Sequence, residues 1–301
     1  MTAEKLDLLV FGDTAVDYFY EVDRLPKVHE ASDVRSGRRF YGGMGANTAV
    51  VAKSLGLKVG LVSVIGTDAD DYRAYLEHLG IKLYLKGIFG ETTKSMFFKT
   101  NGNEISFFQK GVTEKLDELD LEREFGLGMF KNTSAIYLGR TYLKLQRQAV
   151  KHSGDRLKVY NPGYGVFGFE KIPRDFELLV KSVNILILNK HEAEHLESLG
   201  YKPTKARGPA TVIITNGSSG CSIYTKTSEV DVGVYKSKVV DASGAGDAFN
   251  AGLITALLKG HEIYDAVRIG NATASFVVEE WGCQTNLPSW DKVLERHSQI
   301  I

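Results

Sequence analysis

Short runs of apolar residues alternate along most of the chain with stretches in which apolar residues recur every three or four positions. The short runs predict β-strands at residues 6–12, 59–65, 135–139, 157–160, 183–188 and 211–215. They lack strict apolar–polar alternation, which is typical of strands that are covered on both faces. The other stretches predict helices at residues 47–55, 70–79, 143–152 and 191–199. This alternation favours an α/β fold, a doubly wound and mainly parallel sheet flanked by helices.

Two regions, 17–41 and 82–110, interrupt that rhythm because their strand-like runs have no helix between them. The runs of the second region lie at 83–85, 96–98 and 105–108. Asn101-Gly102 separates two of these runs and is a strong signal for a two-residue hairpin. We interpret both regions as insertions that form one small β-sheet lid near the carboxyl ends of the strands, where ligands bind. The alternative is that they are extra strands of the main sheet. Residues 1–301 are thus expected to form one α/β domain with a lid.

Composition and charge exclude several classes of protein. The 301 residues are 43% hydrophobic and 25% charged, which excludes a disordered or collagen-like chain. Lys+Arg and Asp+Glu number 37 each, so the charge gives no reason to expect a nucleic acid or a membrane as partner. The sequence shows neither the ~18-residue apolar run of a membrane span nor a signal peptide. We expect a soluble, cytoplasmic protein in which Cys221 and Cys283 are reduced.

The strongest local signal is VVDASGAGDAF at residues 239–249, where a β-branched run ends in a turn before an apolar helix. The turn contains Gly244, Ala245 and Gly246, and Asp247 follows in the first turn of the helix. Small residues at a helix start let successive N–H groups point at an anion, and the helix dipole adds to the attraction. A carboxylate beside that anion suits proton chemistry, such as accepting the proton of an attacking hydroxyl. The alternative is an ordinary helix start with an aspartate favoured by the dipole.

A second glycine-rich helix start is YGGMGANTA at residues 41–49. It leads out of the first lid insertion instead of a core strand, and it contains no Walker A lysine–hydroxyl pair. That placement argues against a dinucleotide-binding fingerprint and against a P-loop. Gly42 and Gly43 allow close approach of the backbone to a ligand, and the Asn47 amide offers both a donor and an acceptor.

Together these loops, about 200 residues apart, resemble the two signatures of the ribokinase-like (phosphofructokinase-B, PfkB) family of carbohydrate and nucleoside kinases. Residues 42–47 match its G-G-x-G-x-N element, and 241–247 match its D-T-x-G-A-G-D element with Ala242 in place of the usual threonine. The resemblance extends from Val10 to about Val293. It implies the ribokinase-like fold and transfer of the γ-phosphoryl group of ATP to an alcohol. Asp247 would be the base, and the N–H groups of residues 245–247 would form the anion hole.

The resemblance also implies which residues bind the acceptor. Asp17 matches an aspartate that accepts hydrogen bonds from two sugar hydroxyls, a role suited to a bidentate, acceptor-only carboxylate. Asp13 lies in the same segment, where capping of a turn is the alternative, and Asn161 lies where a family loop faces the acceptor. The implied acceptor-binding residues are Asp13, Asp17, Gly42, Gly43, Asn47 and Asn161.

On the nucleotide side, Asn189 and Glu192 resemble the family's N-x-x-E element, whose glutamate helps to hold Mg²⁺ and its waters near the phosphates. Mg²⁺ takes few carboxylates and keeps several waters, so a glutamate acting through water is reasonable; a solvated helical residue is the alternative. TNGSSG at 215–220 resembles a nucleotide loop, and Asn271 falls where the family lines its adenine pocket or is a partly buried helical residue. The implied nucleotide-binding residues are Asn189, Thr215, Gly217, Gly220 and Asn271.

Segments such as 12–18, 189–192 and 272–279 look closest to archaeal nucleoside kinases of this family. We therefore expect a ribonucleoside to be phosphorylated on its 5′-hydroxyl. The alternative is a sugar kinase that acts on ribose, fructose, ketodeoxygluconate or a sugar phosphate. The aromatic residues of the lid could stack on a base or form the lid's own core. They are Tyr18, Phe19, Tyr20, Phe97 and Phe98.

Two rival classes are weighed against the kinase. The intact 244–247 turn argues against a non-catalytic sugar or nucleotide sensor, and the placement of the glycines argues against a nicotinamide-dependent oxidoreductase. ATP against another phosphoryl donor, a monovalent-cation requirement and the oligomeric state stay open. An exposed lid sheet could pair with its twin across a two-fold axis to give a homodimer.

Overall fold

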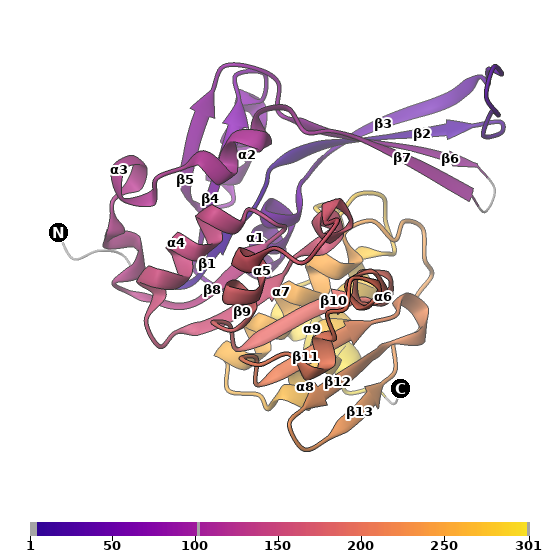
Figure 1. Ribbon diagram of the computed structural model, residues 1–301. Helices are drawn as coiled ribbons and strands as arrows, with labels where there is room; N and C mark the ends of the chain where they lie inside the picture. Colours follow the sequence, from indigo (N-terminus) through magenta and orange to yellow (C-terminus); the bar gives the residue numbers. More distant parts are fainter. Residues whose placement is uncertain (1–4, 101–102, 300–301) are drawn as a thin grey trace.

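The computed structural model describes residues 5–100 and 103–299 and shows a large sheet with helices on both faces, and a small sheet beside it (Figure 1). Neighbouring strands of the large sheet run parallel from β5 to β11, and β12 and β13 add an antiparallel edge. The order is β13 (Glu229–Val232), β12 (Cys221–Thr225), β11 (Thr211–Thr215), β10 (Ile185–Asn189), β9 (Leu157–Asn161), β8 (Thr133–Gly139), β1 (Leu6–Phe11), β4 (Val59–Gly66) and β5 (Lys82–Ile88). The expected doubly wound α/β fold and its six core strands are confirmed.

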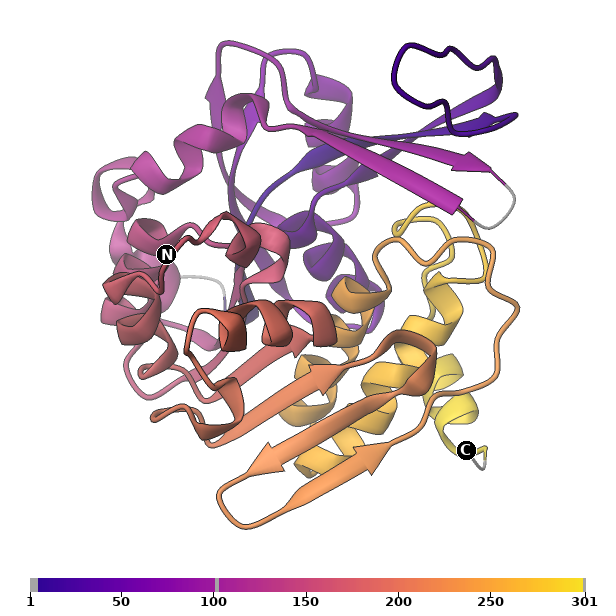
Figure 2. The same cartoon turned by 45° about the vertical axis from the view of Figure 1, so that its right-hand side comes forward.

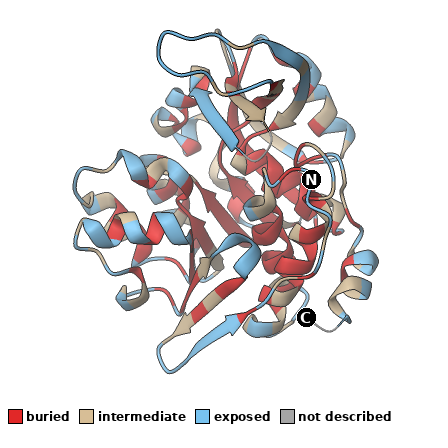
Figure 3. Ribbon diagram, turned by 90° about the vertical axis from the view of Figure 1, so that its right-hand side faces the viewer, coloured by how far each residue is buried: buried red, intermediate tan, exposed pale blue. Residues whose placement is uncertain are grey.

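Two hydrophobic clusters cover the two faces of this sheet, as the buried strands between the helices show (Figure 3). Successive residues of β1 serve opposite clusters: Leu8 and Val10 join one, and Leu9 and Phe11 join the other. Because both faces need apolar side chains, the strands read as continuous apolar runs. The helices on the first face are α1 (Met44–Ser54), α2 (Asp70–His78), α7 (Ala245–Leu258), α8 (Ile263–Val277) and α9 (Trp290–His297). Those on the second face are α3 (Leu121–Phe125), α4 (Leu143–Ser153), α5 (Arg174–Val180) and α6 (Lys190–Ser198).

The small sheet is the lid, and Figure 2 shows it projecting above the loops that lead into α7. Its strands are β3 (Val34–Gly42), β2 (Ala15–Val22), β6 (Thr93–Thr100) and β7 (Asn103–Gln109), in that spatial order. The expected hairpin residues Asn101-Gly102 lie outside the described residues. The strands on either side of them pair antiparallel, with Thr100 opposite Asn103.

One part of the expected lid is wrong. Residues 82–88 form β5, which pairs in parallel with β4 of the large sheet instead of joining the lid. The reason is that α2 lies between β4 and β5 in the chain. The connection is therefore long enough for the β–α–β crossover that joins neighbouring parallel strands. Leu83 and Leu85 pack against the core cluster under α1 and α2. The second insertion therefore gives the lid only β6 and β7, while residues 82–88 follow the alternative of an extra strand in the main sheet.

Both cysteines are buried and unpaired, which confirms the expectation of free thiols. Among the helices of the described residues, none has the length and apolar character needed to cross a membrane.

Candidate active site

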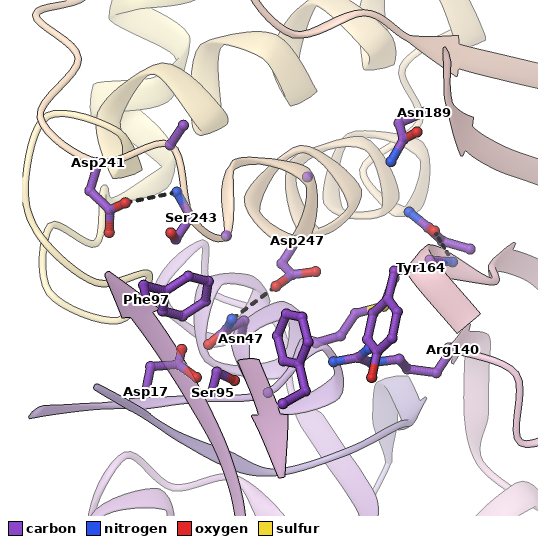
Figure 4. A pocket seen from close by; sticks show the side chains of 18 of the residues that line it. Asp17, Asn47, Ser95, Phe97, Arg140, Tyr164, Asn189, Asp241, Ser243 and Asp247 are labelled. Carbon is purple, nitrogen blue, oxygen red and sulfur yellow. Dashed lines mark hydrogen bonds between the residues drawn. The ribbon is translucent and has the colours of Figure 1, made fainter. Parts of the chain in front are cut away.

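A cavity of about 450 Å³ lies between the lid and the core, and we call it the lid cavity (Figure 4). Its walls come from the inward side of β2, β6 and β7, from the loops after β8, β9 and β10, and from the first turns of α1 and α7. The structure thus brings together segments that are far apart in the sequence. The expected site residues that line this cavity are Asp17, Gly43, Asn47, Asn161, Asn189, Glu192, Thr215, Gly244, Gly246 and Asp247.

A second cavity, of about 520 Å³, adjoins the first, and we call it the α8 cavity. The two cavities share Thr215, Ala242 and Gly246 as lining residues, so they meet at the start of α7. The remaining expected residues on the nucleotide side line the α8 cavity, together with apolar side chains such as Phe249 and Val278. They are Gly217, Gly220, Ala245 and Asn271. Asn271 also donates from Nδ2 to the carbonyl of Gly233 at 2.8 Å, which ties α8 to the segment after β13.

The turn between the two cavities depends on Gly244. This residue has φ +77°, and a Cβ on it would collide with the Cys283 side chain, so only glycine fits there. The N–H of Ala245 donates to the carbonyl of Ala242 at 3.2 Å and is therefore engaged within the turn. The N–H groups of Gly246 and Asp247 have no partner among the described residues, as is usual in the first turn of a helix. Of the three N–H groups expected to form an anion hole, two therefore lack a partner among the described residues.

Asp247 is held at this junction by Asn47, whose Nδ2 donates to Asp247 Oδ2 at 2.8 Å (Figure 4). Burial raises the pKa of the Asp247 carboxyl to about 7, and the hydrogen bond from Asn47 partly opposes the rise. Gln284 in turn donates to Asn47 Oδ1 at 2.8 Å and to the Tyr72 hydroxyl at 2.9 Å. This chain fixes the orientation of the Asn47 amide and joins the two glycine-rich loops. Asn47 thus orients Asp247, beyond the acceptor-binding role that the resemblance implies.

Asp17, on β2, lines the lid cavity near its other wall. Burial raises the pKa of the Asp17 carboxyl to about 7, and the Ser95 hydroxyl partly offsets this rise. Gly42 lies against the Asp17 carboxylate, so closely that a Cβ on Gly42 would collide with it. Gly43 has φ +96°, and a Cβ there would come within 2.7 Å of the backbone of residues 13–15. Gly42 therefore contributes space for the carboxylate, and does not itself line the cavity.

The Asp13 carboxylate contacts groups of the protein itself. Its Oδ2 lies 3.0 Å from Arg140 Nε, and its Oδ1 accepts the N–H of Gly45 at 3.3 Å. It does not line the lid cavity but a neighbouring hollow, so its carboxylate is engaged in tying α1 to the loop after β8. Sequence reasoning missed Arg140, although its position directly after a core strand, at the carboxyl edge of the sheet, is a signal that could have found it.

Asn189 and Glu192 form a reciprocal cap at the start of α6. Glu192 N–H donates to Asn189 Oδ1 at 2.9 Å, while the Glu192 carboxylate accepts from Asn189 N at 2.9 Å and from Asn189 Nδ2 at 2.7 Å. Glu192 is only 4% exposed, and burial raises its pKa to about 7, so the solvated alternative is wrong.

This carboxylate and amide pair faces the lid cavity with oxygen donors, the type that Mg²⁺ prefers. No group of three or more His, Cys, Asp or Glu suited to a metal occurs within residues 5–100 and 103–299. The donor set therefore fits a Mg²⁺ ion that is held mainly by water and by ligand phosphates, with Glu192 contributing from outside.

Few of the expected lid aromatics face the site. Of the five, Phe97 lines the lid cavity, and Phe19 is buried beneath it with ring centroids 4.7 Å apart. Strand alternation sends Tyr18, Tyr20 and Phe98 to the outer face, where Tyr20 and Phe98 stack at 5.0 Å. The aromatics that sequence reasoning missed are Phe108 on β7 and Tyr164 after β9, which stack at 4.9 Å and line the cavity.

The chain belongs to the pfkB family of carbohydrate kinases, because the sequence profile of that family matches residues 5–290. It is a phosphotransferase that uses an alcohol group as acceptor. The nucleoside kinase of Methanocaldococcus jannaschii is 36% identical over 299 residues, covering 95% of this chain and 94% of that protein. The ribokinase of Haemophilus influenzae is 26% identical over 307 residues, covering 96% and 97%.

Solved structures agree with this assignment. The crystal structure of the M. jannaschii nucleoside kinase, a member of the ribokinase family, has a TM-score of 0.84 at 33% identity and covers 98% of this chain and 99% of its own. The Burkholderia thailandensis nucleoside kinase in complex with inosine has a TM-score of 0.85 at 19% identity, with 96% and 97% covered, and so shares the fold. The ribokinase-like resemblance is confirmed, and the alternative of a nicotinamide-dependent oxidoreductase is wrong.

Proposed function

We propose that this protein transfers the γ-phosphoryl group of ATP to the 5′-hydroxyl of a ribonucleoside. The observation that carries the proposal is the meeting of two cavities at the start of α7, with Asp247 and two free amides at the junction. One cavity would hold the nucleotide donor and the other the acceptor. Two nucleoside kinases among the relatives support a nucleoside as the acceptor.

The geometry suggests how this chain's residues act. The adenine moiety would occupy the apolar α8 cavity, and the phosphates would lie along residues 242–246 toward the amides of Gly246 and Asp247. Asp247, with a pKa of about 7, is suited to accept the hydroxyl proton near neutral pH, while Asn47 holds its other oxygen. Mg²⁺ supplies charge neutralisation to the phosphates, and Asn189 and Glu192 would hold it through water.

The charges of the lid cavity favour a neutral acceptor. Its two basic residues are both engaged: Lys99 contacts Asp241 and Glu104, and Arg140 pairs with Asp13. No unpaired Lys or Arg of the described lining remains to bind an acceptor phosphate. A sugar phosphate is therefore disfavoured, whereas a nucleoside or a free sugar meets no such penalty.

The aromatic surfaces favour a nucleoside over a free sugar. Phe97, Phe108 and Tyr164 line the same cavity as Asp17, and one face of the Phe97 ring stacks on Phe19. A nucleoside offers a 2′,3′-diol to the Asp17 carboxylate and a flat base to these rings, and so satisfies both features in one pose. A free sugar satisfies only the first.

ADP release with Mg²⁺-ATP tests the acceptor. The kcat/KM values of inosine and cytidine are expected to exceed those of ribose, fructose, ketodeoxygluconate and fructose 6-phosphate. Loss of the 2′-hydroxyl in 2′-deoxyinosine should cost about 1–3 kcal/mol, because Asp17 would then be partly unpaired in a closed site. A free sugar that exceeds every nucleoside by more than about tenfold, roughly 1.4 kcal/mol, would contradict the proposal.

We also propose a homodimer that forms through the lid. All seven residues of the edge strand β7 are exposed, including the large apolar side chains Ile105 and Phe107. An exposed, apolar edge strand is a template for pairing with a second copy. Sedimentation equilibrium should show a dimer for the natural sequence and a monomer for Phe107→Lys. A natural protein that stays monomeric at tens of micromolar would contradict the dimer.

A further inference from the structure

Lys99, on the lid strand β6, reaches across the lid cavity to the loop that precedes α7. Its Nζ lies 2.7 Å from Asp241 Oδ1 and 3.0 Å from Glu104 Oε2. The same ammonium lies 4.9 Å from the ring centroids of both Phe19 and Trp281. The Asp241 side chain is 0% exposed and that of Lys99 is 18% exposed, so the ion pair between lid and core is largely buried.

Asp241 also fixes two segments beside the anion hole. Its Oδ1 accepts the N–H of Ser243 at 3.1 Å, in the turn before α7, and its Oδ2 accepts the N–H of Gly282 at 3.1 Å (Figure 4 shows the first bond). The second segment continues to Gln284, whose amide orients Asn47. The carboxylate that receives the lid lysine therefore supports both the anion-hole turn and the side chain that holds the catalytic base.

A carboxylate buried this deeply needs a cation, because an unpaired charge in the protein interior is strongly disfavoured. Within the described part of the chain, the basic side chain that contacts Asp241 comes from the lid. A movement of the lid that withdrew Lys99 would leave Asp241 without its ion pair. The hydrogen bonds from Ser243 and Gly282 would then hold an uncompensated charge, and both segments would be free to relax.

We propose that Lys99 is a positioning residue, which completes the anion hole only while the lid is closed and its ammonium contacts Asp241, as in this structure. The inference rests on the phosphoryl transfer proposed above and adds a residue to it. Such coupling limits transfer of the phosphoryl group to water, because the turn before α7 would take its active form only in the closed site. A merely structural lysine would stabilise the lid without affecting the turn.

The kinetic test compares Lys99→Met with Lys94→Met, a control on the same strand. Lys94 is similarly exposed at 24% and pairs at 2.6 Å with Glu91, away from the lid cavity. With Mg²⁺-ATP and inosine, Lys99→Met should lower kcat about 10–100-fold while the KM for inosine changes less than about threefold. Lys99→Arg should recover most of kcat, and Lys94→Met should stay within about twofold of the natural protein. A kcat unchanged in Lys99→Met, or equal losses in both methionine variants, would overturn the proposal.

Hydrogen exchange of the unliganded protein separates this inference from the choice of acceptor. Amides of residues 243–247 and 282–284 should exchange faster in Lys99→Met than in the natural protein or in Lys94→Met. Unchanged exchange there would contradict the coupling whatever the acceptor is. Faster exchange in a protein that does not phosphorylate inosine would instead refute the nucleoside assignment and leave the role of Lys99 intact.

Discussion

The two cavities that meet at the start of α7 are built in different ways. The α8 cavity is lined mainly by apolar and backbone groups from one stretch of chain, residues 215–278. The lid cavity draws on residues from 17 to 247 and is rich in carboxylates. Its acidic residues are Asp17, Glu104, Glu192, Asp241 and Asp247. With the substrates placed as proposed above, the α8 cavity would select ATP by shape, whereas the lid cavity would bind the acceptor through charged groups from distant parts of the sequence.

Removal of the base should have the largest effect. Asp247→Asn keeps the size of the side chain and its contact with Asn47 but cannot accept the proton. We expect kcat to fall about 10²–10⁴-fold while the dissociation constant of the acceptor hardly changes. Single-turnover kinetics and calorimetry measure the two quantities. A variant that keeps more than about a third of kcat would show that Asp247 is not the base.

Asp17→Asn should impair use of the acceptor without affecting binding of ATP. With one carboxylate oxygen replaced by a donor, kcat/KM for inosine should fall about 10–100-fold, which corresponds to the 1.5–3 kcal/mol of hydrogen bonds to a charged group. The KM for ATP should stay the same. The matched control is Asn271→Ala in the α8 cavity, which should raise the KM for ATP and leave that for inosine unchanged. Equal effects of both variants on both substrates would mean that the cavities do not divide the substrates.

Glu192→Gln tests the metal-facing wall of the lid cavity. The glutamine keeps the bond from its own N–H to Asn189 Oδ1 and one of the two bonds that the carboxylate accepts from Asn189, and it removes the charge. We expect the Mg²⁺ concentration for half-maximal rate to rise roughly tenfold, as for a group that acts on a metal from its outer shell. The same titration on Glu194→Gln, an exposed glutamate of α6, is the control. An unchanged Mg²⁺ dependence would leave Glu192 with a capping role alone.

The last effect concerns stability instead of catalysis. Burial raises the pKa of Asp17, Asp247 and Glu192 to about 7, so the folded protein holds protons between about pH 4 and 7 that the unfolded chain releases. The free energy of unfolding should therefore fall as pH rises through this window. Asp247→Asn removes one of these groups, and its stability relative to the natural protein should grow by about 1–3 kcal/mol from pH 5 to pH 8. Urea titrations at both pH values that give the same difference would contradict the raised pKa.

The sequence predicted those parts of the molecule that local patterns determine. The core strands were found because burial on both faces leaves continuous apolar runs, and the turn at Gly244 because its small residues are adjacent in the chain. What it could not predict depends on tertiary pairing. Strand pairing, which no local pattern reveals, placed residues 82–88 in the large sheet, and packing of β7 against the segment after β9 put Phe108 beside Tyr164. The engagement of Asp13 by Arg140 likewise joins residues 127 positions apart.

We propose above that the two cavities bring ATP and the 5′-hydroxyl of a nucleoside to Asp247. The most direct measurement is ³¹P NMR of the products formed from inosine and Mg²⁺-ATP. We predict ADP together with a phosphomonoester whose phosphorus couples to the two 5′-methylene protons of inosine. A phosphomonoester coupled to a 2′ or 3′ proton, or inorganic phosphate with unchanged inosine, would contradict the account.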